Sequence, residues 1–168
     1  MSKEFKSKID TQSESFLKNR AEMLKKIKEM RNLEKRSFNA SESKRKKFED
    51  RNQLTPRERL NALIDPDSEF IELYNMAGFL VEDNNPETSI PGASVIAGIG
   101  FIKGVRCMIM VDDSGINAGA ATSTTVDKCV GCLEISLEKK LPFVHLVESA
   151  GINLMNYKVE IWARAGGM

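Results

Sequence analysis

Two stretches of small residues most constrain how this chain can fold, because each follows an apolar strand-like run. Residues 115–121 follow the run 105–111, and residues 149–151 follow the run 143–147. A helical pattern comes after each stretch, which gives the order strand, loop, helix, strand, loop, helix of an α/β fold. Since binding sites in such folds lie at the carboxyl ends of strands, both loops are predicted to lie at a functional site.

The N-terminal third predicts helices. Apolar residues at helical spacing, with charges on the other face, predict a helical arm over about residues 13–50 that ends in the basic run 44–47. Thr55-Pro56-Arg57-Glu58 combines a capping box with proline at the first helical position. It therefore predicts a short helix, which Asp65-Pro66 stops.

The middle of the chain predicts strands, followed by a helix. Residues 70–73 are expected to form a strand, and residues 82–92 a loop. The β-rich runs 93–102 and 105–111, joined through Lys103-Gly104, predict a hairpin whose second strand is buried on both faces. A helix is expected from about Thr124 to Lys139, with a core stripe of Val126, Cys129, Val130, Leu133 and Leu137. A further helix is expected from about Asn156 through Ile161 and Trp162.

Charge and composition favour a cytoplasmic protein with neither nucleic acid nor membrane as a partner. The chain has 25 basic and 24 acidic side chains, and acidic residues interleave with the basic ones of the arm. No run approaches the ~18 consecutive apolar residues that a membrane span needs. Three cysteines without a secretory segment indicate a reducing compartment.

The cysteines and the histidine, which often bind metals or act in catalysis, favour a structural interpretation in this sequence. Cys129 and Cys132 lack a second ligand pair, so buried core thiols are preferred over a metal site, and no bound metal is expected. His145 lies in the middle of an apolar strand, which favours a hydrogen-bonded structural histidine over a general base.

Ser149, Ala150 and Gly151 have a better functional case. Small residues at a strand end allow the backbone to approach a ligand closely. Two successive backbone N–H groups can point at one carbonyl oxygen and stabilise an oxyanion without a titrating side chain. A plain tight turn remains the alternative interpretation of this segment.

Several motifs, in order, resemble the β subunits of acyl-CoA carboxylases, which include the propionyl-CoA and methylcrotonyl-CoA carboxyltransferases. They are residues 52–60 (NQLTPRERL), 63–68 (LIDPDS), 91–98 (PGASVIAG) and 148–151 (ESAG). The resemblance covers about residues 50–168. It implies an incomplete crotonase-like ββα superhelix over 51–168, preceded by the charged helical arm at 1–50.

The resemblance also implies a reaction that moves a carboxyl group from carboxybiotin to the α-carbon of an acyl-CoA. Ala150 and Gly151 match a Gly-Gly pair whose amides hold the thioester carbonyl, although Ala150 adds a methyl group. Ser149 and the loop with Gly119, Ala120 and Ala121 match a region near the acyl-CoA. Biotin is expected on a separate carrier, and the expected partners are acyl-CoA, the biotin carboxylase and carrier subunits, and further β subunits.

Two alternatives stay open beside a partial carboxyltransferase subunit that is inactive by itself. One is a non-catalytic chain that only associates with longer carboxylase subunits through its arm. The other is a different crotonase-like enzyme, such as a hydratase or thioesterase, for which Glu148 is the candidate carboxylate. The residues do not determine which acyl chain is bound.

Overall fold

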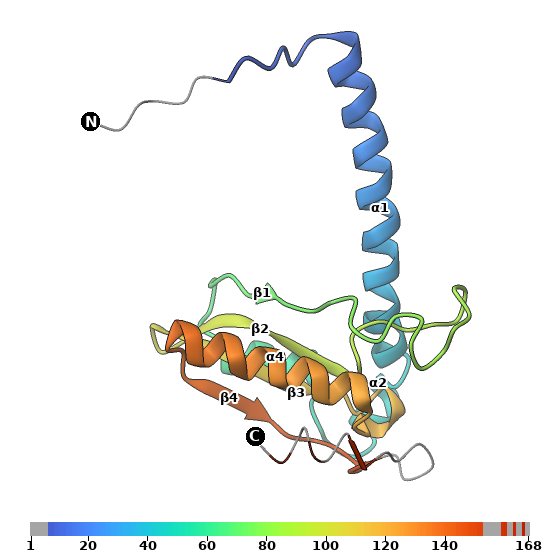
Figure 1. Cartoon of the computed structure of the whole chain (residues 1–168). Helices are drawn as coiled ribbons and strands as arrows, with labels where there is room; N and C mark the ends of the chain where they lie inside the picture. Colours follow the sequence, from blue (N-terminus) through green and yellow to red (C-terminus); the bar gives the residue numbers. More distant parts are fainter. Residues whose placement is uncertain (1–6, 153–158, 161–162, 164–165, 167–168) are drawn as a thin grey trace. The chain divides into compact units, whose positions relative to one another are not determined.

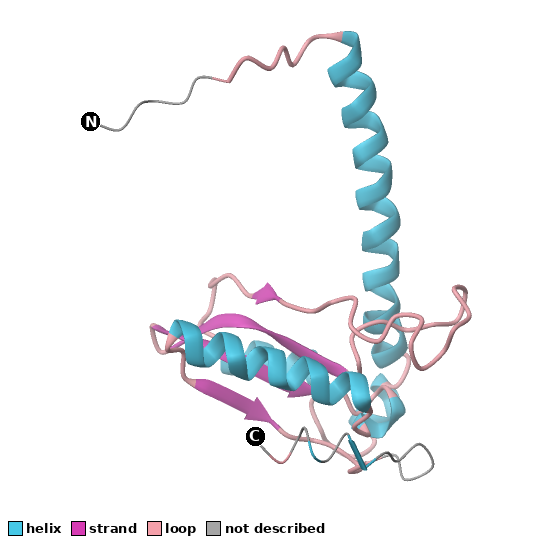
Figure 2. Ribbon diagram, viewed as in Figure 1, coloured by secondary structure: helices cyan, strands magenta, loops and turns pink. Residues whose placement is uncertain are grey.

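The computed structural model describes residues 7–152, 159, 160, 163 and 166, in two compact units, Met1–Asn32 and Leu33–Met168. The helical elements are α1 (Glu14–Glu42), α2 (Arg45–Glu49), α3 (Pro56–Leu63), the 3₁₀ turn η1 (Asn117–Gly119) and α4 (Ser123–Lys139). The strands are β1 (Ile71–Glu72), β2 (Val95–Ile102), β3 (Val105–Asp112) and β4 (Phe143–Leu146). Figure 1 and Figure 2 show these elements. Of the helix predicted from Asn156 through Ile161 and Trp162, the structure describes only residues 159 and 160, which are helical; the rest of that range lies outside the described residues.

The predicted helices of the N-terminal third are confirmed, with one interruption. Residues 43 and 44 separate α1 from α2 inside the stretch predicted as one arm. The capping box of α3 is formed: the Thr55 side chain accepts a hydrogen bond from the Glu58 N–H, and the Glu58 carboxylate accepts one from the Thr55 N–H. No described helix is both long and apolar enough to cross a lipid bilayer.

The four strands form one sheet in the order β1-β2-β3-β4. β1 and β3 both pair antiparallel with β2, and the β2–β3 hairpin turns at Lys103-Gly104, as predicted. The pair β3–β4 is parallel, and α4 makes the connection between these two strands. β3 and β4 therefore end at the same edge of the sheet.

β3 is the centre of the core, because its residues are buried on both faces of the sheet, as its sequence predicts. Cys107, Ile109 and Val111 join the cluster that includes Leu60 of α3. Met108 and Met110 join a second cluster with Cys132 of α4, and Figure 2 shows α4 along this sheet. The sheet is thus packed between α3 and α4.

The face of α4 that meets the sheet is only partly the predicted one. The most buried residues of α4 are Lys128, Cys132 and Ser136, whereas Leu137 of the predicted core stripe is 83% exposed. Cys129, which was predicted to be in the core, does pack against it. The prediction was wrong for Leu137 because it counted only apolar residues. It therefore left out Lys128, whose amine has hydrogen-bond partners inside the fold and whose side of the helix faces the sheet.

Those partners are backbone carbonyls. Lys128 Nζ donates to Val95 O at 2.6 Å and to Gly92 O at 3.1 Å, so that α4 is tied to the start of β2. Burial lowers the pKa of Lys128 to about 8, because the charged amine loses its hydration.

We predict that this lysine makes stability rise with pH in alkaline solution. Between pH 8 and its ordinary pKa of ~10.4, the unfolded chain binds more protons than the folded chain, so the free energy of unfolding increases by up to ~3 kcal/mol. Lys128→Met removes this titration. Urea unfolding of both proteins from pH 7 to 10.5 measures the difference, and parallel pH curves would contradict the assignment.

Candidate functional site

The parallel pairing of β3 and β4 brings the two small-residue loops together. Beyond the last paired residues, the Ala121 N–H donates to Gly151 O at 2.8 Å, and a parallel bridge joins Ala121 to Ile152. The Ser149 hydroxyl donates to Gly119 O at 2.6 Å. The six residues predicted for the site therefore lie in two adjoining segments, residues 119–121 and 149–151. Their roles in binding stay predictions.

Gly119 makes this close approach possible. Its φ of +68° is in the left-handed region. A Cβ at this position would stand 3.2 Å from Ser149 Cα and would overlap the Glu148 carbonyl oxygen. Any side chain at position 119 would thus force the two loops apart.

The two candidate oxyanion donors are both hydrogen-bonded within the protein. The Ala150 N–H donates to Ala118 O, and the Gly151 N–H donates to the Ser149 hydroxyl, each at 3.0 Å. Gly151 is therefore held by a side chain that can rotate, whereas Ala150 is held by backbone. A ligand carbonyl would have to take the place of these acceptors.

A polar network fixes the strand end just before these amides. Asp112 accepts from the Glu148 N–H at 3.0 Å through one oxygen and lies 2.8 Å from His145 Nε2 through the other. The Glu148 carboxylate accepts from Arg59 at 2.5 Å and from the Ser114 hydroxyl at 2.7 Å. The loops after β3 and β4 are thus tied to each other and to α3.

Asp113 anchors the first loop from the other side. Its carboxylate accepts from the Ser41 hydroxyl at 2.7 Å and from the Gly115 N–H at 3.1 Å. Burial raises the pKa of Asp113, and the two hydrogen bonds oppose part of that rise. The end of α1 is therefore joined to the loop that follows β3.

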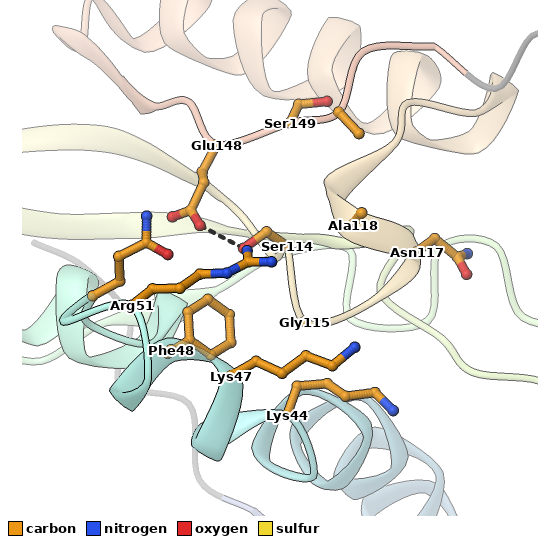
Figure 3. A pocket seen from close by; sticks show the side chains of 12 residues that line it. Lys44, Lys47, Phe48, Arg51, Ser114, Gly115, Asn117, Ala118, Glu148 and Ser149 are labelled. Atoms are coloured by element: carbon orange, nitrogen blue, oxygen red, sulfur yellow. Dashed lines mark hydrogen bonds between the residues drawn. The ribbon is translucent and has the colours of Figure 1, made fainter.

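A pocket of about 470 Å³ opens between α2 with its following turn and the two loops. Figure 3 shows Lys44, Lys47 and Arg51 on the helical wall, and Glu148 and Ser149 on the opposite wall. The complete lining is Lys44, Lys47, Phe48, Arg51, Gln53, Ser114, Gly115, Asn117, Ala118, Glu148, Ser149 and Ala150. Three cations thus face a wall of loop backbone and small or polar side chains.

Of the six predicted site residues, only Ser149 and Ala150 line this pocket. Gly119, Ala120, Ala121 and Gly151 lie in the same two loops but outside the lining. Sequence reasoning missed Arg59 and Ser114, whose contacts to Glu148 span 89 and 34 residues. The sequence predicts the basic run 44–47 only as the end of the helical arm, not as part of a pocket.

The interpretation as buried core thiols fits Cys132, whereas Cys129 is only half-buried and His145 is exposed on its strand. Cys132 is completely buried, and burial raises the pKa of its thiol to about 11, far from a reactive thiolate. His145 has Asp112 as its partner. Within the part of the chain that the structure describes, no three His, Cys, Asp or Glu side chains gather to hold a metal ion.

Comparison with known families and proteins gives a consistent match. The family profile described as "Carboxyl transferase domain" matches residues 47–167. A "Probable biotin-dependent acyl-coenzyme A carboxylase beta2 subunit" of Mycobacterium tuberculosis is 40% identical over 118 residues, 70% of this chain and 21% of that protein. The mitochondrial methylcrotonoyl-CoA carboxylase beta chain of Arabidopsis thaliana is 35% identical over 147 residues, 87% of this chain and 24% of that protein.

Solved structures match as well. The beta subunit of P. aeruginosa geranyl-CoA carboxylase has a TM-score of 0.87 and 39% identity, and the match covers 97% of this chain and 30% of that subunit. Transcarboxylase 12S with bound methylmalonyl-coenzyme A has a TM-score of 0.69 at 24% identity, over 87% of this chain and 28% of that one, which shows the fold alone. This chain therefore spans about a fifth to a third of the length of these relatives.

We predict that Gly119→Ala separates the two loops and lowers stability well beyond the cost of its backbone conformation. Gly104→Ala is the matched control, because Gly104 also has a positive φ (+76°) but no atom near its absent Cβ. Both variants carry the ~1 kcal/mol cost of a left-handed residue. Only Gly119→Ala adds the overlap with Glu148, so thermal unfolding should separate them, and equal losses would contradict the close approach.

Proposed function

The chain belongs to the carboxyl transferase domain family and has the crotonase-like α/β fold, and on that premise we propose that it supplies an acyl-CoA thioester site. In the complete reaction, a carboxyl group would move to the α-carbon of the bound acyl-CoA. The observation that carries the proposal is the pocket itself, in which the loop bearing Ser149 and Ala150 faces a basic helical wall. A CoA thioester matches both walls of the pocket, because its nucleotide end is anionic and its reactive end is a carbonyl.

The proposed catalytic groups are the backbone N–H groups of Ala150 and Gly151. Loss of a proton from the α-carbon turns the thioester into an enolate, whose oxygen carries the new negative charge. Two N–H donors aimed at that oxygen stabilise the charge more than they stabilise the neutral thioester, which is what accelerates the step. The methyl group of Ala150 would lie beside the acyl chain and limit its size.

The free energy needed to release each N–H from its present acceptor would differ between Gly151 and Ala150. The Ser149 hydroxyl leaves the Gly151 N–H by rotation of one side chain, which also breaks its hydrogen bond to Gly119 O but needs no movement of the backbone. The Ala150 N–H is released from Ala118 O only if one loop shifts slightly against the other. We therefore expect Gly151 to be the first donor to reach a bound carbonyl, with Ala150 engaging as the loops adjust.

Carboxybiotin would supply the carboxyl group from a separate carrier domain or subunit, as the biotin-dependent descriptions of the relatives suggest. In this proposal the strand-end amides at residues 118–121 and 149–151 bind the thioester. They are therefore not available for biotin, and we assign no described residue to it. The isolated chain is accordingly expected to bind acyl-CoA without transferring carboxyl.

Association with other carboxylase subunits is a second candidate role, which the unit 1–32 favours. Its described helical part carries large apolar side chains that are 46–61% exposed, namely Leu17, Met23, Leu24 and Met30. Such side chains at helical spacing form a face that another helix could cover. This role is compatible with a thioester site in the other unit.

We predict that an analogue of the enolate binds at least 100-fold more tightly than a ligand without the oxygen. Nitroethyl-CoA, whose nitronate resembles the enolate, is compared with S-ethyl-CoA by titration calorimetry on the whole chain. Ala150→Pro removes one donor and should reduce the ratio by about tenfold or more, while Ala150→Gly keeps the N–H and should preserve it. Equal affinities of both ligands for the unmodified chain would rule out the oxyanion role.

A further inference from the structure

Ser114 and Glu148 form a hydrogen-bonded pair on the wall of the pocket, and the proposed function gives neither of them a role. The Ser114 hydroxyl donates to Glu148 Oε1 at 2.7 Å, and Figure 3 shows this bond between the loops that follow β3 and β4. Both residues line the pocket together with Ala150. A hydroxyl that donates to a carboxylate in this way is a candidate nucleophile with its base.

Arg59 orients that base from a third part of the chain. Its guanidinium, on α3, donates to Glu148 Oε2 at 2.5 Å, and the side chains of Arg59 and Glu148 are 18% and 29% exposed. The backbone of Glu148 is fixed as well, because its N–H donates to Asp112 at 3.0 Å. Ser114 therefore faces a carboxylate that is held in position but still reached by solvent, which is the arrangement of a nucleophile, a base and an orienting group.

Ser149, the other serine of the pocket lining, has a different environment. Its hydroxyl donates to Gly119 O at 2.6 Å and accepts from the Gly151 N–H at 3.0 Å. These partners are backbone groups of the two loops, and a backbone carbonyl does not act as a general base. Of the two serines, it is Ser114 that has a base within hydrogen-bond distance.

We propose that this chain hydrolyses the thioester bond of acyl-CoA, with Ser114 as the nucleophile, Glu148 as the general base and Arg59 as a positioning residue. The inference rests on the proposed function, because it uses the same bound thioester and the same two N–H donors. An enolate and a tetrahedral intermediate both carry their negative charge on the former carbonyl oxygen, so donors that suit one also suit the other. Water is the only co-substrate, and the chain can complete this reaction without carboxybiotin.

The reaction has two steps. Ser114 Oγ first attacks the carbonyl carbon, and its proton passes to Glu148. The oxyanion forms at the Ala150 and Gly151 N–H groups, the C–S bond breaks, and the CoA thiolate leaves with the proton from Glu148. The acyl group is then an ester on Ser114. Water next loses a proton to Glu148 and attacks this ester, the C–O bond to Ser114 breaks, and Ser114 takes the proton back, which releases a carboxylic acid.

The test measures the release of CoA from acetyl-CoA by chromatography on the whole chain. Ser114→Ala removes the nucleophile and Glu148→Gln removes the base, so each should lower the rate at least ~100-fold. Ser43→Ala is the matched control, because the Ser43 hydroxyl is exposed, donates to Ala40 O at 2.7 Å and lies outside the pocket lining. It should change the rate less than about twofold, as is usual for an exposed position.

Two further measurements keep the test decisive. Thermal unfolding and binding of S-ethyl-CoA check that each variant folds and keeps the pocket, and Ser114→Ala, which removes a single oxygen atom, decides alone if Glu148→Gln is unstable. Peptide mass spectrometry after rapid acid quenching should find an acetyl group on Ser114 in the unmodified chain and in Ser43→Ala. An acetyl group on a different residue as the only adduct would overturn the assignment of the nucleophile.

The outcomes separate this activity from the thioester proposal. Hydrolysis that is lost in Ser114→Ala supports the inference. Tighter binding of nitroethyl-CoA without any hydrolysis would keep the thioester site and overturn the inference. Hydrolysis that persists in Ser114→Ala would mean direct attack by water and would overturn the role of Ser114. Equal affinities of nitroethyl-CoA and S-ethyl-CoA, together with no release of CoA, would overturn both proposals.

Discussion

The parallel pairing of β3 with β4 is the constraint on which the candidate site depends. Because the two strands run in the same direction, both end at one edge of the sheet, and the loops that follow them must meet there. Close contact then requires Gly119, since any Cβ would overlap the carbonyl of Glu148. The sheet thus positions the backbone that forms the site. The small residues allow the backbones of the two loops to come close to each other.

Polar residues hold this edge where small residues alone could not. Asp112 and Asp113, at the end of β3, are both buried, and each accepts hydrogen bonds from a different part of the chain. Arg59 reaches Glu148 from α3, the helix that begins with the capping box in the family-like motif. Buried carboxylates are costly without partners, so this network limits how far the loops can move apart.

Local signals in the sequence predicted the elements well, and signals that depend on tertiary contacts were missed. The hairpin at Lys103-Gly104 and the start of α3 followed from a few adjacent residues, and the structure confirms both. The buried face of α4 was partly wrong, because Lys128 is stabilised inside by carbonyls 33 and 36 residues away. Lys44, Lys47 and Arg51, which have no ion pair among the described residues, could not be distinguished from Arg45 by composition, since only the fold shows which charges already have partners.

Hydrogen exchange of backbone amides with and without CoA tests most directly whether the helical wall and the strand-end loops form one binding pocket. Saturating CoA should slow exchange both in residues 44–51 and in residues 117–121 and 149–151, with little change in the β2–β3 hairpin turn. Protection restricted to one wall, or confined to the turn at Lys103-Gly104, would contradict it.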